Sequence, residues 1–310
     1  MRACVDIGGT KIAVSLVEKG SQELVARQKE PTVKTGANDA VAQQVIRLID
    51  AACQAHGVSP DSIDAVGVSS AGPFVMTDGC VELASPNICG GLAGPERGLP
   101  NDWMTAVIEA PLRARFKHVR VANDAVAALE AERRWGALKG MDHCAYVTWS
   151  TGVGVGLCVD GRPLRGKNGN AGHAGHSFVA DDDNAHALCG CGNVGDVEGL
   201  VAGNAMERRF SRSAEDLLEA AAAGEAEAAK TVDGLCRVMG RLLYNLIVTL
   251  DLQAISLGGS VFWNNRDFLL PRLQAEIDGK LVPLTRGVTL HAAGLGDKVG
   301  DYAALALVDD

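Results

Sequence analysis

Two similar hairpins, separated by about half of the chain, constrain the fold more than any other feature of the sequence. The first covers the apolar residues 3–17 and turns at Gly8 and Gly9, while the second covers 145–159 and turns within 150–156. Apolar runs interrupted by a glycine-bearing turn predict a strand, a tight turn and a second strand. Because the arrangement occurs twice, we interpret the chain as an internal duplication in which each half opens with a β-hairpin.

Both turns carry groups that suit a nucleotide phosphate. Adjacent glycines leave backbone N–H groups without side-chain cover, and Thr10 and Lys11 add a hydroxyl and a cation to the first turn. The second turn offers Thr151 and Gly152. The first turn is not a Walker A loop and the second is not a dinucleotide fingerprint, because both of those motifs open a helix. An ordinary hairpin turn is the alternative for either one alone, and their repetition favours phosphate binding.

Residues 171–198 combine two closely spaced cysteines with an upstream histidine and a downstream carboxylate. Nitrogen, sulfur and oxygen ligands of these kinds suit a tetrahedral zinc ion. A disulfide between the two cysteines would close too small a ring. The nine cysteines of the chain, scattered largely through apolar segments, indicate reduced thiols. A glycine-rich surface loop with two idle cysteines is the alternative. The predicted metal ligands are His176, Cys189, Cys191 and Asp196.

The composition argues against several classes of protein. Hydrophobic residues make up 47% of the chain and charged residues 22%, which is typical of a globular protein. The net charge of −9, with no basic cluster to offset it, argues against a nucleic-acid partner. The first residues enter a strand pattern without a signal-peptide core, and no apolar run is long enough to cross a bilayer. We therefore expect a cytoplasmic protein that binds neither nucleic acid nor membrane.

The remaining apolar patterns predict further helices and strands. In the first half these are a helix over 39–53 with Asn38 or Asp39 as N-cap, strands over 65–68 and 119–122, a loop or lid over 84–101, and a helix over 125–135. In the second half they are helices over 214–230, 232–251, 267–279 and 299–308, and strands over 254–257 and 288–292.

The metal loop resembles the signature of the ROK family of bacterial sugar kinases and repressors. The resemblance lies in Gly175-His176 followed by Cys-x-Cys-Gly-x-x-Gly-x-x-Glu, and related motifs extend it over nearly the whole chain. Members of the family hold zinc with one His and three Cys beside the sugar pocket. Here Asp196 replaces the usual third Cys, and His173 replaces the usual Glu. Asp can bind zinc through oxygen, so the metal site is retained, with weaker zinc binding expected than for the usual ligands.

The resemblance implies the α/β fold of the actin-like, or ribonuclease H-like, ATPases, in which two lobes with duplicated mixed sheets close on ATP. Asp6-Ile7-Gly8-Gly9-Thr10-Lys11 resembles the first phosphate motif of that fold, residues 150–154 resemble the second, and Leu257-Gly258-Gly259-Ser260 resembles the adenosine motif. On this basis we expect an N-terminal lobe over 1–121, with the C-terminal helix 299–310 packing back onto it. The C-terminal lobe is expected over 122–298.

The same resemblance assigns roles to polar residues of the two lobes. Asp124 would be the general base, Asn123 would hold a sugar hydroxyl, and Asp6 would lie near the Mg²⁺ that bridges the ATP phosphates. From the residues alone, Asp124 could simply be a helix N-cap, because a carboxylate between a strand and a helix most often has that role. Asn87 could equally be an ordinary turn asparagine. The positions expected to contact the sugar are Gly72, Asn87, Asn123, Asp124, His173, His176 and Glu198.

The implied reaction is ATP-dependent phosphorylation of the 6-hydroxyl of a hexose or hexosamine. A neutral His173 suits an altered hydroxyl pattern and favours N-acetylmannosamine or an amino hexose. A glucokinase or mannokinase, a sugar-binding protein without catalysis, and polyphosphate as the phosphoryl donor all stay open. Repressors of the family carry a winged helix-turn-helix before the first phosphate motif, whereas here the first strand begins at Ala3. Relatives are commonly dimers or tetramers, so we expect a homodimer or homotetramer.

Overall fold

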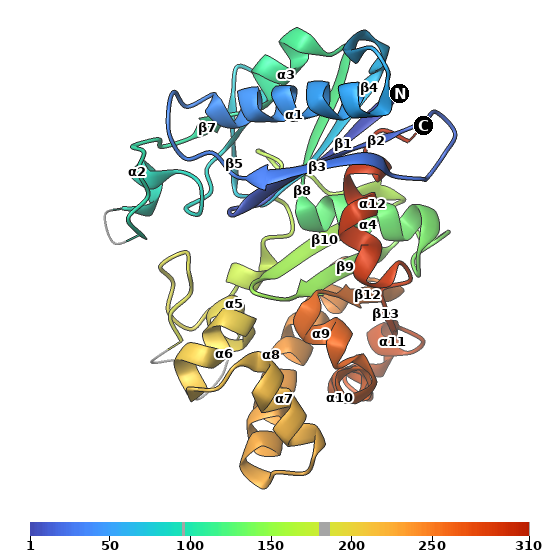
Figure 1. The fold of residues 1–310 in the computed structure, drawn as a ribbon. Coiled ribbons are helices and arrows are strands. Elements are labelled where there is room, and N and C mark those ends of the chain that lie inside the picture. The colour runs from blue at the N-terminus through green and yellow to red at the C-terminus, as the bar shows by residue number, and fades with distance from the viewer. Residues whose placement is uncertain (95–96, 180–186, 310) are drawn as a thin grey trace. The chain divides into compact units, whose positions relative to one another are not determined.

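Two compact units make up the chain, and each contains a five-stranded mixed sheet. The computed structural model describes residues 1–94, 97–179 and 187–309 (Figure 1). Unit 1 consists of Met1–Ala131, Arg165–Ala171 and Gly300–Asp310, and unit 2 consists of Glu132–Leu164 and Gly172–Val299. The lobe boundary expected from the sequence, between residues 121 and 122, stays a prediction.

The sheet of unit 1 has the strand order β3-β2-β1-β4-β8. Its strands are β1 (Arg2–Ile7), β2 (Lys11–Val17), β3 (Val25–Pro31), β4 (Ala65–Ser70) and β8 (His118–Asn123). The β1–β2 pair is antiparallel and confirms the first predicted hairpin, whereas β1, β4 and β8 run parallel. The carboxyl ends of these three strands therefore meet at one edge of the sheet.

Helices cover both faces of this sheet. Buried residues of α1 (Ala40–His56) and α3 (Glu109–Arg115) pack with alternate β1 residues, beginning at Ala3, on one face. Residues of α4 (Asp124–Trp135) and α12 (Val299–Ala306) pack on strands of the other face. Contact there is close, since a Cβ on Gly67 of β4 would lie 2.1 Å from the carbonyl oxygen of Ala304. Asp39 occupies the N-cap position of α1, but its side chain makes no capping hydrogen bond.

The segment expected to be a loop or lid contains regular structure. It includes the short helix α2 (Gly90–Ala93), while residues 95–96 lie outside the described part of the chain. A small antiparallel sheet is formed beside it by β5 (Phe74–Thr77), β6 (Cys80–Leu83) and β7 (Ala106–Val107).

The sheet of unit 2 repeats the plan of the first, with the order β11-β10-β9-β12-β13. Its strands are β9 (Cys144–Trp149), β10 (Val153–Val159), β11 (Arg162–Pro163), β12 (Ala254–Gly258) and β13 (Thr289–Ala292). An antiparallel pair, β9–β10, again adjoins parallel strands, β9, β12 and β13. The expected turn over 150–156 is shorter than predicted, because Gly154 and Gly156 already belong to β10.

The helices of unit 2 differ from the prediction in one helix boundary and in four helices that were not predicted. They are α5 (Val197–Val201), α6 (Gly203–Phe210), α7 (Ala214–Ala222), α8 (Ala226–Leu250), α9 (Ser260–Asn264), α10 (Arg266–Ile277) and α11 (Val282–Thr285). The break expected at residue 231 falls instead at Gly224, whose φ of 90° is costly for other residues. Helices α5, α6, α9 and α11 were not predicted, and α5 begins at the end of the predicted metal loop. Within the described ranges, no helix has the length and apolar character needed to span a membrane.

Candidate functional site

Polar side chains gather at the carboxyl edge of the unit 1 sheet. The strand register places Asp6 beside Ser69, and Ser70 beside Asn123. Asp124 follows directly as the first residue of α4. In α/β sheets, ligands bind outside the carboxyl ends of parallel strands. The structure therefore brings Asp6, Asn123 and Asp124, all singled out from the sequence, to the edge where a ligand is expected.

Asp124 combines exposure to solvent with a raised proton affinity. Its side chain is exposed, and its Oδ1 accepts a hydrogen bond from the N–H of Ala125 at 2.8 Å. Desolvation by the dense protein around it raises the pKa of Asp124 from 3.8 to about 6, and the charge of Asp6 acts in the same direction, while the Ala125 hydrogen bond opposes both. A reachable carboxylate with such a pKa can accept a proton near neutral pH.

Asp6 lies among charges of both signs. Burial raises the pKa of its carboxyl above the ordinary value, Lys11 and Arg27 oppose that rise, and Asp301 adds to it. Arg27 and Asp301 themselves form an ion pair with 2.9 Å between Nη2 and Oδ1. Asp6 is thus a partly buried carboxylate with charged groups of both signs nearby.

The first glycine turn is held by its neighbours in unit 1. The N–H of Gly8 donates to the carbonyl of Lys11 at 2.9 Å, and the hydroxyl of Thr32 donates to the carbonyl of Gly8 at 2.7 Å. A Cβ on Gly9 would lie 2.7 Å from the Cβ of Asn87, so only glycine fits beside that side chain. The structure therefore places Asn87 directly against the tip of the first turn.

The second glycine turn lies beside the predicted adenosine motif in unit 2. Gly258 at the end of β12 pairs with Thr148 of β9, and the hydroxyls of Ser150 and Ser260 are 2.9 Å apart. Gly259 has a φ of 86°, and a Cβ there would lie 2.5 Å from the Trp149 carbonyl oxygen. Thr151–Gly152 and Gly258–Gly259 therefore meet at the carboxyl ends of two adjacent parallel strands.

The four metal ligands predicted from the sequence come together in unit 2. One ligand atom from each of His176, Cys189, Cys191 and Asp196 lies within 4.8 Å of all the others. Asp196 Oδ2 is 3.3 Å from His176 Nδ1 and 3.4 Å from Cys191 Sγ, and Cys189 Sγ is 3.5 Å from the same His176 nitrogen. Metal–ligand bonds of about 2.0–2.3 Å imply tetrahedral edges of about 3.3–3.8 Å. The cluster therefore fits a zinc ion.

Without a metal, two ligand groups of this cluster hold their protons more tightly than usual. The hydrogen bond that His176 donates to Asp196 raises the pKa of His176 above its ordinary value. Burial raises the pKa of the Cys189 thiol strongly. A bound dication would lower the thiol pKa instead, because its charge stabilises the thiolate directly. The cluster would consequently release protons when it binds metal.

Two glycines bring both histidines against β10. Cβ atoms on Gly172 and Gly175 would each lie 2.2 Å from a β10 carbonyl oxygen, so the backbone there can pack closely only without side chains. The ring centroids of His173 and His176 are 6.1 Å apart. Because His176 faces the cluster through Nδ1, its Nε2 can serve another partner.

Two contacts in unit 1 were not anticipated from the sequence. Arg97 donates to Oδ1 of Asn87 at 2.6 Å, which orients the amide so that it presents its NH₂ group. Thr32 supports the first turn, as described above. Neither residue belongs to a motif, and both act across loops, so spacing along the chain carried no signal for them.

The loop after β4 is bonded back to β1. The N–H of Ala71 donates to the carbonyl of Ile7 at 3.3 Å, and Gly72 is the next residue.

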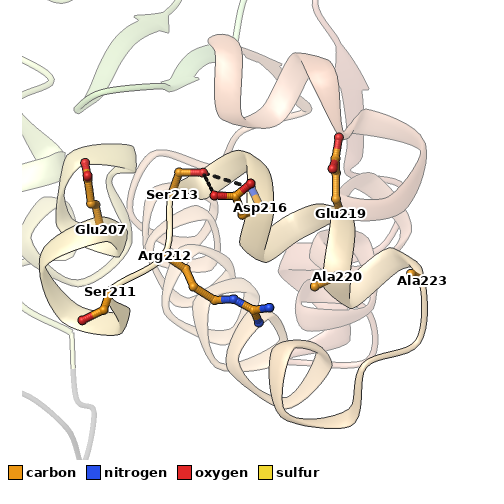
Figure 2. A pocket seen from close by; sticks show the side chains of 8 residues that line it. All are labelled: Glu207, Ser211, Arg212, Ser213, Asp216, Glu219, Ala220 and Ala223. Carbon is orange, nitrogen blue, oxygen red and sulfur yellow. Dashed lines mark hydrogen bonds between the residues drawn. The ribbon is translucent and has the colours of Figure 1, made fainter.

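A surface hollow of about 710 Å³ in unit 2 contains none of the predicted residues (Figure 2). It is lined by Glu207, Ser211, Arg212, Ser213, Asp216, Glu219, Ala220 and Ala223. The Arg212 guanidinium pairs with Glu225 at 2.8 Å, and Ser213 caps α7 by accepting from the N–H of Asp216 at 3.1 Å. Its polar groups serve the local structure, so we do not assign it to the site.

Comparisons with known proteins agree on one family. A model of the ROK family matches residues 2–310. A glucokinase of Aeropyrum pernix is 29% identical, with 98% of this chain and 95% of that protein aligned. An N-acetylmannosamine kinase of Haemophilus influenzae is 30% identical, with 83% and 79% aligned.

Solved structures give the same picture of the fold. A ROK hexokinase from Thermus thermophilus is 30% identical with a TM-score of 0.74, and the match covers 99% of this chain and 97% of that one. A ROK family glucokinase from Streptomyces griseus, in complex with glucose and AMPPNP, is 25% identical with a TM-score of 0.71 and coverage of 98% and 97%. The predicted actin-like ATPase fold, with a duplicated mixed sheet, is confirmed.

Proposed function

Because this chain belongs to the ROK family, we propose that it is an ATP-dependent sugar kinase acting on the 6-hydroxyl of a hexose or hexosamine. The observation that carries the proposal is Asp124, an exposed carboxylate at the sheet edge with a pKa raised to about 6. A carboxylate in that state can accept the proton of an attacking hydroxyl as its bond to phosphorus forms. Relatives named glucokinase and N-acetylmannosamine kinase support this reaction class.

The nucleotide would be bound by the two glycine turns and the adenosine motif. Phosphoryl transfer passes through a loose transition state, so positioning and charge stabilisation dominate the rate. The turn residues Gly8, Gly9, Thr10 and Lys11, together with Thr151 and Gly152, would surround the phosphates. The backbone donors would come from residues other than Gly8, whose N–H already donates to the carbonyl of Lys11. Gly258 and Gly259 would border the adenosine. Mg²⁺, when bound, would neutralise phosphate charge, and Asp6 would be its protein carboxylate.

The residues proposed to contact the sugar are those that the family resemblance implies. Asn87 and Asn123, near Gly72, would contact hydroxyls, and His173, His176 and Glu198 would do the same. Zinc, held by the four-residue cluster, would fix the tautomer and orientation of His176 and take no part in the chemistry. An imidazole at position 173, where a carboxylate is usual, favours N-acetylmannosamine or an amino hexose over glucose. A homodimeric or homotetrameric state stays a prediction.

Two alternatives have specific support. A glucokinase or mannokinase is favoured by the glucokinase relatives. A sugar-binding protein without catalysis stays open because of the two departures, His173 and Asp196, from the family pattern, although Asp124 and the glycine turns argue against it. Use of polyphosphate instead of ATP as donor is compatible with the same residues.

A phosphorylation screen tests the proposal. Hexoses, N-acetylhexosamines and aminohexoses are each assayed with Mg-ATP and with Mg-polyphosphate, and product formation is measured. We expect turnover with ATP, and a higher kcat/KM for N-acetylmannosamine or an amino hexose than for glucose. The 6-deoxy analogue of the best substrate should bind without being phosphorylated. Sugar binding without turnover on any substrate would leave the non-catalytic alternative.

The activity should fall as the pH drops through about 6. The pKa of Asp124 is raised to about 6, so its protonated, inactive form accumulates below that pH. We expect kcat/KM for the sugar to decrease about tenfold for each pH unit on the acid side. The measurement is a pH profile of kcat/KM from about 4.5 to 9, which covers the pH range on both sides of the raised pKa of Asp124. Circular dichroism shows over which part of that range the protein stays folded. An acid limb near the ordinary carboxyl value would contradict the raised pKa of Asp124.

A further inference from the structure

The short helix α5 connects the metal cluster to the second glycine turn. In the first turn of α5, Glu198 Oε2 accepts from the N–H of Val153 at 2.9 Å. At the end of the helix, the carbonyl of Val201 accepts from the indole N–H of Trp149 at 2.7 Å. Just beyond α5, the N–H of Gly203 donates to the carbonyl of Ser150 at 2.8 Å. The residues on both sides of the turn at 150–152 are therefore bonded to segment 198–203.

The same helix begins within the metal cluster. Asp196 is its N-cap, and Oδ1 accepts from the N–H of Gly199 at 2.7 Å, which leaves Oδ2 facing His176 and Cys191. The thiol of Cys189 lies 3.3 Å from Glu198 Oε1. The carboxylate of Glu198 thus contacts the predicted metal ligand Cys189 through Oε1, and Val153 beside the glycine turn through Oε2.

Packing leaves little freedom between the two sites. A Cβ on Gly152 would lie 2.7 Å from Glu198 Oε2, and a Cβ on Gly199 would lie 2.4 Å from the carbonyl oxygen of Ala187. Val197, Leu200 and Trp149 are fully buried. A change in the position of α5 must consequently be transmitted to the turn, because close-packed groups cannot absorb it.

We propose that the metal cluster positions the nucleotide-binding turn as well as the sugar pocket, with Glu198 and Trp149 as the positioning residues. A helix of five residues is not stable on its own. Its start is held by Asp196, whose second oxygen, Oδ2, faces the other ligands and would bind the metal. When the metal leaves, the clustered ligand groups lose their shared partner, and the first turn of α5 loosens together with the acceptor for Val153. This inference rests on the proposed function, in which the 150–152 turn receives ATP phosphates.

Amide hydrogen exchange gives the first test and needs no catalytic activity. In the full-length protein loaded with zinc, the Val153 amide should be protected from exchange. Removing zinc with a chelator should speed exchange in a peptide covering residues 149–157, while exchange in the β1–β2 hairpin of unit 1 should not change. Unchanged protection of the 149–157 peptide after complete metal removal would overturn the proposal.

Nucleotide affinity gives the second test. Calorimetry with Mg-AMPPNP, without sugar, compares zinc-loaded and zinc-free protein. Loss of one or two hydrogen bonds to the turn should weaken binding about fivefold to tenfold. Equal affinity of the two forms would overturn the inference and leave the kinase proposal intact. Absence of binding even to the loaded protein would overturn the kinase proposal and the nucleotide role of the turn with it.

A variant that leaves the metal ligands untouched separates coupling from general loss of stability. Trp149→Phe removes the donor to Val201 while keeping an aromatic ring in the core. Its zinc content should equal that of the native protein, and its affinity for Mg-AMPPNP should fall severalfold. Trp103→Phe is the matched control, because Trp103 also donates to a backbone carbonyl, that of Gly36 at 3.1 Å, but lies in unit 1. Equal losses in both variants would contradict the proposal.

Discussion

Asp124→Asn should lower kcat by about 10²–10⁴-fold, because asparagine cannot accept the proton of the sugar hydroxyl. Sugar affinity should change little, since the amide has nearly the shape of the carboxyl group and keeps an oxygen that can accept from Ala125, as Oδ1 does at 2.8 Å. The measurement combines steady-state kinetics with calorimetric titration of the sugar.

Asp78→Asn is the matched control for this variant. Asp78 is an exposed carboxylate of unit 1 in the β5–β6 turn, with a φ of 51° that asparagine tolerates. Its kcat should equal that of the native protein. Substantial kinase activity in Asp124→Asn would refute the role of Asp124 as general base, and a parallel loss of sugar affinity would indicate a binding role instead.

Cys189→Ser should release the metal, loosen sugar binding and lower stability together. A ligand present at a thousand times its Kd stabilises the folded state by about 4 kcal/mol. For a domain of this size, losing that contribution lowers Tm by roughly 10 °C. His176 would also lose the partner that orients it, so the Kd for the sugar should rise. Metal analysis, calorimetry and thermal denaturation measure these three effects.

Cys80→Ser controls for the loss of a thiol as such, since Cys80 lies in unit 1 and takes no part in the cluster. It should keep one metal ion per chain and native affinity for the sugar. If metal-free Cys189→Ser bound the sugar as tightly as the native protein, the proposed link between the cluster and the sugar pocket would be wrong.

Local patterns were sufficient to predict the elements that depend on neighbours in sequence. Both hairpins were visible as apolar runs around glycine turns, because strand and turn preferences act over a few residues. The four side chains predicted as metal ligands do come together in the structure. Their spacing in the sequence pointed to this, since a metal site needs particular donor atoms at short spacing. The break between α7 and α8 was misplaced, because apolar spacing continues on both sides of Gly224 and only the backbone conformation reveals the end of the helix.

The roles of single glycines and of Glu198 depended on contacts between distant segments. Gly9 and Gly152 looked alike as turn residues, but their closest neighbours are Asn87 and Glu198, more than forty residues away in both cases. The contact of Arg97 with Asn87 lies within the segment predicted as a loop or lid, where no motif pairs the two residues. Spacing along the chain contains no information on such pairs.

The sequence by itself determined the duplicated hairpin plan, the donor atoms of the metal cluster and the carboxylate between β8 and α4, because each is a property of a few consecutive residues. Only the tertiary structure decided that Asp6, Asn123 and Asp124 share a sheet edge, and that α5 bonds the metal cluster to the 150–152 turn. Those arrangements arise from strand register and close packing, which are set by the whole of each unit and by no segment alone.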